Sequence, residues 1–277
     1  MFEHQARAES RADELPGDHH QRNFAHHAAG PWPLLERNCD IADCETGSRK
    51  LESGVIFEQL QVWMDPVQRS GPEAMAVDEW LLDVAAAPVL RVYRWLGEWA
   101  TVGYFGNLAL AQDALPGVRW VRRWTGGGVV DHRADWTYTV VARSGEALAD
   151  RRGAESYRHI HQALVAALAA ERSGVRLSLG DEQTGAALCF ENPVSHDLVG
   201  GDGRKLAGAG QRRTRRGLLH QGSVAAACDA AVSQQRAATL ATGMARAWQF
   251  FDFEVPDEAI ARLVRGRYAD PAWTWRR

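Results

Sequence analysis

The sequence predicts an α+β fold, in which helices flank a mixed and largely antiparallel β-sheet. Segments that alternate apolar and polar residues, as strands do, outnumber the helical segments. Most neighbouring strands are separated by short turns, which join strands into hairpins. These two observations argue against a doubly wound nucleotide-binding fold, in which parallel strands alternate with helices.

The composition is that of a globular protein with one large core. Of the 277 residues, 45% are hydrophobic and 24% are charged. The net charge of −3 predicts no general attraction to nucleic acid or to membranes, and no apolar run is long enough to span a bilayer. The N-terminus lacks the apolar centre of a secretory signal, and the four cysteines are irregularly placed. We therefore expect a cytoplasmic protein with reduced thiols.

Residues 1–54 differ from the rest of the chain. They are polar and rich in histidine and lack apolar periodicity, so they cannot bury enough surface to offset the entropy of ordering. We expect this segment to be disordered, or to be an over-extended start of translation. Its histidines, Cys39 and Cys44 match no zinc-ligand spacing, and no metal site is predicted. Residues 55–277 are expected to form the folded domain.

Local patterns place the elements of this domain. Met75 and Leu82 share the apolar face of a helix that Pro88 ends. Asp78 and Glu79 are expected near its start, where the helix dipole favours acidic residues. The expected helices span residues 74–86, 107–115, 154–171, 229–248 and 256–265, and the expected strands span residues 57–65, 89–95, 101–105, 118–122, 136–142, 175–179, 186–190, 197–199, 204–211 and 217–225, with a hairpin around the glycine turn at 200–203.

Residues 121–132, VRRWTGGGVVDH, form the first candidate site. Glycines let the backbone turn sharply and bring its N–H groups close to a ligand. Arg122 and Arg123 alternate across a strand, so one is expected to face inward, where a guanidinium is costly unless an anion meets it. The three glycines alone would equally suit an ordinary hairpin that needs a positive φ. His132 has two interpretations, as a structural histidine or as a catalytic one.

Residues 203–224, GRKLAGAGQRRTRRGLLHQGSV, repeat this pattern of glycines and cations. Lys205 is either an exposed strand lysine or a cation that polarises a carbonyl or holds a phosphate oxygen. The arginines from Arg212 to Arg216 are interpreted as a solvated turn. Cys189, sixteen residues before Lys205, is either a buried apolar residue or a nucleophile whose thiolate the lysine favours. Two such segments in one domain suggest a site for an anionic or activated-acyl ligand.

Four segments, in order, resemble the lipoate–protein ligase and octanoyltransferase family, which shares its catalytic domain with biotin–protein ligases. They are MAVDEWLL (75–82), VLRVYRW…TVGYF (89–105), RRWTGGGVVDH…TYTVV (122–141) and GRKLAGAGQRR…LLHQGSV (203–224). The resemblance covers about residues 57–277, including YADPAW (268–273). It implies the fold of the biotin/lipoate ligase domain, a mixed sheet flanked by helices with an acyl tunnel through it.

The resemblance also implies roles for individual residues. Lys205 matches the lysine that contacts the acyl carbonyl and, in ligases, the adenylate phosphate. Cys189, in CFENP, resembles the nucleophile segment of one octanoyltransferase subgroup. Two positions depart from the pattern: Gly128 is more similar to ligases than to those transferases, and Asp131 stands where an apolar residue is usual. The implied acyl- or adenylate-binding residues are Arg123, Gly126, Gly127, Gly128, Val129, Val130, Asp131, His132 and Gly208.

The family resemblance implies an enzyme of protein lipoylation with one of two mechanisms. An octanoyltransferase moves an acyl group from a carrier to a cysteine thiolate and then to a lysine, without a cofactor, whereas a ligase activates free lipoate with ATP and Mg²⁺. The context of Cys189 favours the octanoyltransferase. The implied partners are lipoyl carrier domains (glycine cleavage protein H and the E2 component of 2-oxoacid dehydrogenases) and acyl carrier protein or free lipoate or octanoate. Biotin–protein ligation and a non-catalytic module that binds lipoyl domains are the remaining alternatives.

Overall fold

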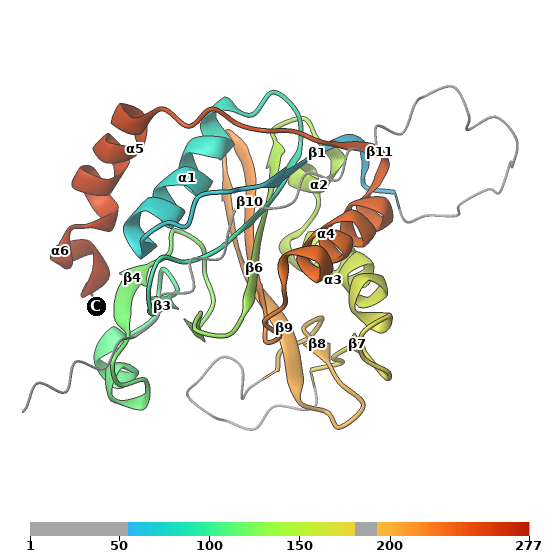
Figure 1. Cartoon of the computed structure of the whole chain (residues 1–277), viewed down its shortest axis with the longest axis horizontal. Coiled ribbons are helices and arrows are strands. Elements are labelled where there is room, and N and C mark those ends of the chain that lie inside the picture. The colour runs from blue at the N-terminus through green and yellow to red at the C-terminus, as the bar shows by residue number, and fades with distance from the viewer. Residues whose placement is uncertain (1–54, 181–192, 277) are drawn as a thin grey trace, which may run out of the picture. The chain divides into compact units, whose positions relative to one another are not determined.

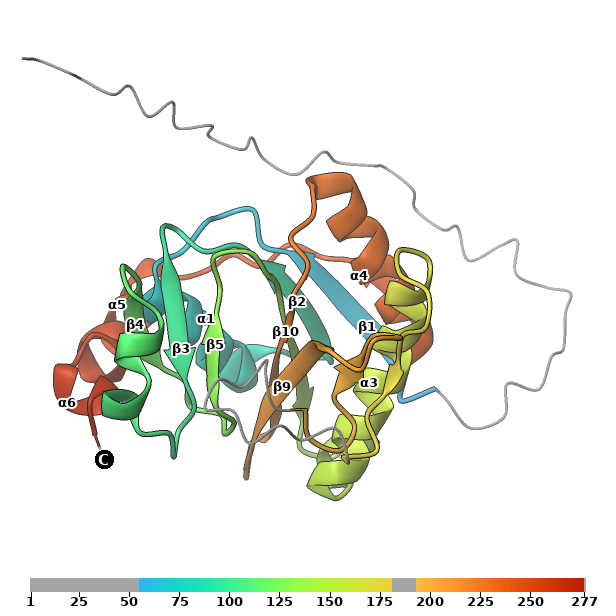
Figure 2. The same cartoon turned by 90° about the horizontal axis from the view of Figure 1, so that it is seen from below.

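The computed structural model of the chain describes residues 55–180 and 193–276. An eight-stranded sheet and a three-stranded sheet form the framework, and helices cover both faces of the larger sheet (Figure 1, Figure 2). This arrangement confirms the expected α+β fold class. Residues 1–54, Cys189 and the strand expected at 186–190 lie outside the described residues. Within the described part, no helix is both long and apolar enough to cross a membrane.

The larger sheet is mixed, with the strand order β11-β1-β2-β6-β10-β9-β8-β7. β1 (Phe57–Met64) pairs in parallel with β2 (Val89–Tyr93) on one side and with β11 (Ala245–Phe250) on the other. All other neighbours in this sheet pair antiparallel, and the expected glycine-turn hairpin is confirmed as the β8–β9 pair. The remaining strands are β6 (Trp136–Arg143), β7 (Arg176–Leu177), β8 (Leu198–Val199), β9 (Lys205–Thr214) and β10 (Gly217–Val224).

Two apolar cores lie on opposite faces of the larger sheet because successive strand residues point to opposite sides. Val140 packs on the face covered by α3 (Gly153–Ala169) and α4 (Ala230–Met244). Its neighbour Val141 packs on the other face, which α1 (Gly71–Val84) and α5 (Asp257–Leu263) cover. Figure 1 shows these two helix groups on either side of the strands. The shorter helical segments are α2 (Ala147–Asp150), η4 (Val264–Tyr268) and α6 (Pro271–Thr274).

The smaller sheet contains the strands on either side of the glycine segment. β3 (Trp99–Val102) lies between β4 (Arg119–Arg122), which is parallel to it, and β5 (Val129–Asp131), which is antiparallel. The glycine turn therefore does not close a hairpin, because both flanking strands pair with β3 instead. Residues 107–115, expected as one helix, form two 3-10 turns, η1 (Leu108–Leu110) and η2 (Gln112–Ala114), where the Asn107 side chain accepts the Ala109 N–H (3.1 Å).

Two other expectations from the local pattern are wrong. Residues 245–248 were expected to continue a helix but lie in β11, because their backbone pairs in parallel with β1 at the edge of the sheet. The helix that contains Asp78 begins earlier than expected, at Gly71, where the Ser70 N–H donates to the Glu73 side chain (2.9 Å). Asp78 therefore lies in the middle of α1, fully buried and away from the favourable end of the helix dipole.

Arg122 on β4 is fully buried and is satisfied by backbone oxygens rather than by an anion. Its guanidinium donates to the carbonyl oxygens of Gly103 (2.8 Å) and Gly106 (2.7 Å). It also donates to those of Thr274 (2.9 Å) and Arg276 (2.8 Å). The idea that an inward-facing arginine marks an anion site is wrong for this residue. Arg122 instead holds the C-terminal segment against the loop that follows β3.

Candidate active site

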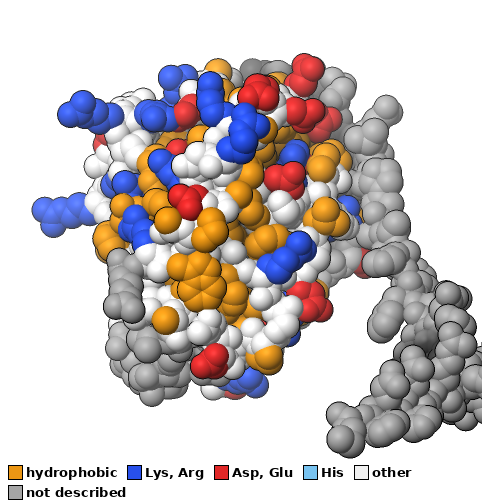
Figure 3. Space-filling view, turned by 90° about the vertical axis from the view of Figure 1, so that its left-hand side faces the viewer, with side chains coloured by type: hydrophobic (Ala, Val, Ile, Leu, Met, Phe, Trp, Pro, Cys, Tyr) orange, Lys and Arg blue, Asp and Glu red, His pale blue; other side chains and the backbone are white. Residues whose placement is uncertain are grey.

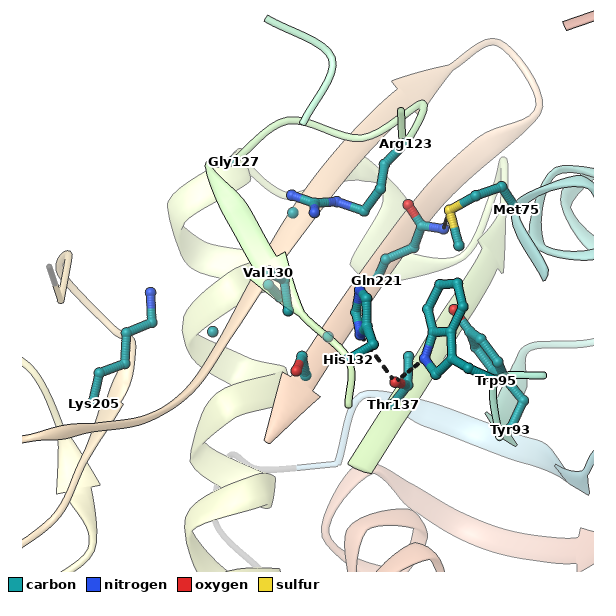
Figure 4. A pocket seen from close by; sticks show the side chains of 15 residues that line it. Met75, Tyr93, Trp95, Arg123, Gly127, Val130, His132, Thr137, Lys205 and Gln221 are labelled. Carbon is teal, nitrogen blue, oxygen red and sulfur yellow. Dashed lines mark hydrogen bonds between the residues drawn. The ribbon is translucent and has the colours of Figure 1, made fainter. Parts of the chain in front are cut away.

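A pocket lies where the smaller sheet meets β9 and β10, and it encloses about 420 Å³ including its open mouth. Figure 4 shows Lys205 on one side, Arg123 and Gln221 in between, and a group of bulky side chains on the opposite side. The pocket is thus cationic at one end and largely aromatic at the other. Its lining residues are Met75, Tyr93, Trp95, Arg123, Gly127, Val130, His132, Thr137, Lys205, Gly208, Ala209, Gly210, Gln221, Gly222 and Ser223.

The pocket brings together the two cationic segments that the sequence singles out. The expected site residues that line it are Arg123, Gly127, Val130, His132, Lys205 and Gly208. The others that the structure describes lie beside it without lining it: Gly126, Gly128, Val129 and Asp131. Val129 packs in the apolar core of the smaller sheet, and Asp131 pairs with Arg133 (2.6 Å). Cys189 lies outside the described residues, and the roles of all these residues stay predictions.

Glycines allow two backbones to approach closely at this pocket. A Cβ on Gly103 would overlap the carbonyl oxygen of Gly127, and a Cβ on Gly210 would overlap that of Gly126. Gly127 itself has φ +95°, a left-handed conformation that side chains disfavour. Across the contact, the Gly126 N–H donates to a carbonyl oxygen of β9 (3.3 Å). This contact joins residues 124–128, which we call the glycine loop, directly to the larger sheet.

Arg123 follows β4 and holds the glycine loop from the pocket side. Its Nη2 donates to the carbonyl oxygens of Gly126 (3.1 Å) and Gly128 (3.0 Å), and its Nη1 donates to Oγ1 of Thr101 (2.5 Å). Arg123 is only 5% exposed, and these hydrogen bonds offset the cost of burying its charge. Sequence reasoning missed Thr101, because nothing in its strand pattern distinguishes it from an ordinary β residue.

The buried carboxylate of Asp135 is linked to Arg123 through His132 and Thr101. Asp135 accepts from Nδ1 of His132 (2.7 Å), and Nε2 of His132 lies 2.8 Å from Oγ1 of Thr101. Arg123 only donates to the Thr101 hydroxyl, and the Asp135 carboxylate only accepts. The neutral tautomer that fits both contacts has its proton on Nδ1 and accepts the Thr101 hydroxyl proton on Nε2. The Trp95 ring stacks on His132 with 4.2 Å between centroids. His132 therefore connects Asp135 to Arg123, with both of its ring nitrogens engaged.

Lys205, at the start of β9, is held by a buried carboxylate. Its Nζ lies 2.7 Å from Oδ2 of Asp197, which is fully buried. Tyr157 on α3 donates to the other carboxylate oxygen of Asp197 and accepts the Ala209 N–H (2.8 Å). Burial raises the pKa of Tyr157 well above its ordinary value, so this phenol stays protonated and remains a donor. These contacts fix the position of the Lys205 side chain at the pocket.

The Asp78 carboxylate fixes the position of Gln221, a residue of β10 that lines the pocket. Its carboxylate accepts from Nη1 of Arg91 (2.6 Å), from the Thr139 hydroxyl (2.9 Å) and from Nε2 of Gln221 (2.7 Å). Gln221 in turn accepts from the Thr125 hydroxyl in the glycine loop (2.7 Å). A buried carboxylate is costly unless several donors satisfy it, so these contacts act together. Asp78 thereby links α1, the larger sheet and the glycine loop.

Two histidines are buried against the Tyr157 ring. His161 donates from Nδ1 to the His196 carbonyl oxygen (2.7 Å), while its Nε2 is buried without a hydrogen-bond partner among the described residues. Burial lowers the pKa of His161 from its ordinary 6.5 to about 4. Burial also lowers the pKa of His220 well below its ordinary value. Both imidazoles are therefore neutral at pH 7.

Comparison with known proteins assigns the chain to a family. The description "Lipoyl protein ligase A/B catalytic domain" matches residues 70–244, which include the glycine loop and Lys205. The chain therefore belongs to the lipoyl protein ligase A/B catalytic domain family.

Two bacterial relatives have similar sequences. Octanoyltransferase LipM of Symbiobacterium thermophilum is 34% identical over 176 residues, which are 58% of this chain and 63% of that protein. Octanoyltransferase LipM of Carboxydothermus hydrogenoformans is 33% identical over 178 residues, which are 60% of this chain and 65% of that protein. The chain thus spans less than two thirds of the length of these relatives.

Solved structures share the fold. Lipoate-protein ligase A bound with ATP has a TM-score of 0.56 at 17% identity, covering 79% of this chain and 98% of that one. A bipartite lipoate protein ligase from Thermoplasma acidophilum, described with its E2 lipoyl domain, has a TM-score of 0.56 at 16% identity, covering 80% of this chain and 96% of that one. At these identities the likeness establishes the fold alone, and it confirms the expected biotin/lipoate ligase-type catalytic domain.

We expect Gly210→Ala to lower the free energy of unfolding by about 1–3 kcal/mol, because its methyl group overlaps the Gly126 carbonyl oxygen and forces the backbone apart. Urea denaturation measures the change. Gly126→Ala is the matched control, since a Cβ at Gly126 meets no atom within 4 Å. Equal stability of the two variants would contradict the close backbone contact.

The buried His161 predicts a loss of stability in acid. Its pKa is depressed to about 4 in the folded protein, so the unfolded chain binds a proton first as the pH falls below 6.5. The contribution of neutral His161 is therefore complete above pH 6.5 and is lost progressively toward pH 4. His161→Asn should reduce the decrease in unfolding free energy over this window, as measured by urea denaturation at several pH values. His159→Asn, at a part-exposed position of the same helix, should change it less, and identical pH profiles for wild type and His161→Asn would show that His161 is not buried neutral.

Proposed function

We propose that this protein transfers an octanoyl or lipoyl group to a lysine of a lipoyl carrier domain through a thioester on Cys189. The observation that carries the proposal is the pocket, which Arg123 and Lys205 line from two separate segments and whose far end is formed by bulky side chains. The similarity to octanoyltransferases LipM supports the same activity. Acyl carrier protein is the proposed donor, and glycine cleavage protein H or an E2 lipoyl domain the proposed acceptor.

The bulky side chains at the far end of the pocket would contact the apolar tail of an acyl group. Burial of each CH₂ contributes about 0.8 kcal/mol, so an octanoyl tail gains several kcal/mol on leaving water. In this proposal the tail points toward Met75, Tyr93 and Trp95, and the carbonyl lies near Lys205. The Lys205 ammonium, which Asp197 holds in place, stabilises the negative charge that develops on the carbonyl oxygen.

The proposed reaction consists of two acyl transfers. The Cys189 thiolate attacks the carbonyl of the acyl–carrier thioester, a new C–S bond forms, and the carrier thiolate leaves and takes up a proton. The neutral amine of the acceptor lysine then attacks the Cys189 thioester. A C–N bond forms, the Cys189 thiolate leaves, and the amine loses its proton to water. Neither step consumes ATP.

ATP-dependent ligation through a lipoyl-adenylate is the second candidate, and the three consecutive glycines at 126–128 favour it. In that mechanism Lys205 contacts the adenylate phosphate. Among the described residues, no group of three or more His, Cys, Asp or Glu side chains is arranged to hold a metal ion. Asp197 is also engaged by Lys205 and Tyr157. The described residues thus contain no protein-only metal site, and we assign no step to Mg²⁺.

Incubation with octanoyl–acyl carrier protein, without ATP, is expected to increase the mass of the protein by one octanoyl group. Addition of a lipoyl carrier domain should then move that group to the domain. Cys189→Ala should abolish both changes, because it removes the attacking thiolate. Intact-mass spectrometry measures both products. Cys228→Ala is the matched control, since burial raises the pKa of the Cys228 thiol and disfavours its thiolate.

Other results of the same incubation would indicate one of the alternative functions. Acylation of the acceptor only with ATP, unaffected by Cys189→Ala, would reject the thioester and establish the ligase. Transfer of biotin in place of octanoate would indicate biotin–protein ligation. Binding of the lipoyl domain without any acylated product would indicate a non-catalytic module.

A further inference from the structure

A surface of aromatic and arginine side chains lies on the outer side of the glycine loop. We call it the arginine–aromatic surface and define it by Tyr104, Phe105, Trp124, Arg212 and Arg276. Phe105 is 86% exposed, and its ring meets that of Tyr104 edge-on with 4.8 Å between centroids. Figure 3 views the side of the described domain that carries α5 and α6, where apolar side chains are exposed among charged ones.

Arg212 and Arg276 have no carboxylate partner in the described part of the chain. The Arg276 guanidinium lies 3.6 Å from the Tyr104 ring centroid, and that of Arg212 lies 4.8 Å from Tyr104 and 4.9 Å from Trp124. Arg267 also stacks on Trp124 (5.2 Å) but is paired with a glutamate (2.5 Å). The Nε of Arg212 is buried and has no hydrogen-bond partner among the described residues. The surface is thus locally positive on a chain whose net charge is −3.

The stacking contacts also hold the Arg212 and Arg276 side chains in place in the unbound protein. The Arg212 guanidinium stacks on the rings of both Tyr104 and Trp124. Arg276 donates to the Tyr104 carbonyl oxygen (3.0 Å) and also stacks on the Tyr104 ring. Long side chains that are already fixed lose little conformational entropy when a partner binds. The cations and the exposed Phe105 ring are therefore presented in one defined arrangement.

The arginine–aromatic surface is separated from the pocket by one loop. Trp124 directly follows Arg123, which lines the pocket, and the Tyr104 N–H donates to the Thr125 carbonyl oxygen (2.8 Å). Arg212 lies two residues beyond Gly210 on β9, so it faces the same side of the strand as Gly210. A protein bound to this surface would therefore contact the loop whose other side lines the pocket.

We propose that the arginine–aromatic surface docks an acidic face of the domain that accepts the acyl group, an inference that rests on the proposed function. Tyrosine, tryptophan and arginine are the residues that most often dominate binding energy at interfaces, and uncompensated cations select a negatively charged partner. Both candidate mechanisms end on a lysine of an acceptor domain, whereas a protein acyl donor takes part in only one of them. The acceptor is therefore the occupant that this surface fits in either mechanism.

Calorimetric titration with a lipoyl carrier domain tests this assignment. Arg212→Glu and Phe105→Ser are each expected to weaken binding by about tenfold or more, since they remove a cation and an exposed anchor. Added salt should weaken wild-type binding by screening the charges. Arg246→Glu is the control, because Arg246 is exposed on β11 and pairs with Glu58 (2.9 Å), away from the arginine–aromatic surface. Phe105→Ser alters a side chain that is 86% exposed, so its folding should match the wild type.

Unchanged affinity of both variants for the lipoyl domain would overturn the inference. The inference would also be overturned if both variants bound octanoyl–acyl carrier protein more weakly but bound the lipoyl domain as tightly as the wild type does. The surface would then belong to the acyl donor. The proposed function can be tested separately from the docking surface. A wild-type protein that binds the lipoyl domain through this surface but acylates nothing would keep the docking site and reject acyl transfer.

Discussion

The site depends on a contact between two backbones that only glycine permits. Gly210 admits the carbonyl oxygen of Gly126, so the glycine loop lies directly against β9. Gly103 admits the carbonyl oxygen of Gly127, so the loop also lies directly against the residue that follows β3. A larger residue at Gly210 would push the glycine loop away from β9. The cation on each segment could then no longer line the same pocket.

Buried carboxylates fix the side chains that this contact brings together. Asp197 holds Lys205, Asp78 holds Gln221, and Asp135 connects through a histidine and a threonine to the arginine that clamps the loop. A carboxylate removed from water is stable only when its donors stay in place, so each aspartate selects one arrangement of its neighbours. A site fixed in this way needs little rearrangement when charge develops on a bound carbonyl.

The sequence identifies the two segments that meet at the pocket but not the residues that support them. Arg123 and Lys205 belong to glycine-rich cationic segments that the local pattern marks, and the family resemblance singles out these two residues within them. In sequence, Asp78 resembles an acidic residue at the start of a helix. Its role as a buried acceptor cannot be seen locally, because its partners lie 13, 61 and 143 residues away. One of Arg122 and Arg123 is expected to face inward and meet an anion, yet buried Arg122 is satisfied by carbonyl oxygens, one of them 152 residues further on. Residues 245–248 have a helical pattern but join the sheet, since β1 offers backbone partners that no local window contains.

A crystal structure with a non-hydrolysable octanoyl thioester analogue would test the central claim most directly. We expect the tail to lie in the pocket, directed toward Trp95, with its carbonyl oxygen about 3 Å from Nζ of Lys205. The Gly126 and Gly210 backbones should remain in contact around it. An analogue bound outside this pocket, or bound with its carbonyl at the Trp95 end, would contradict the account.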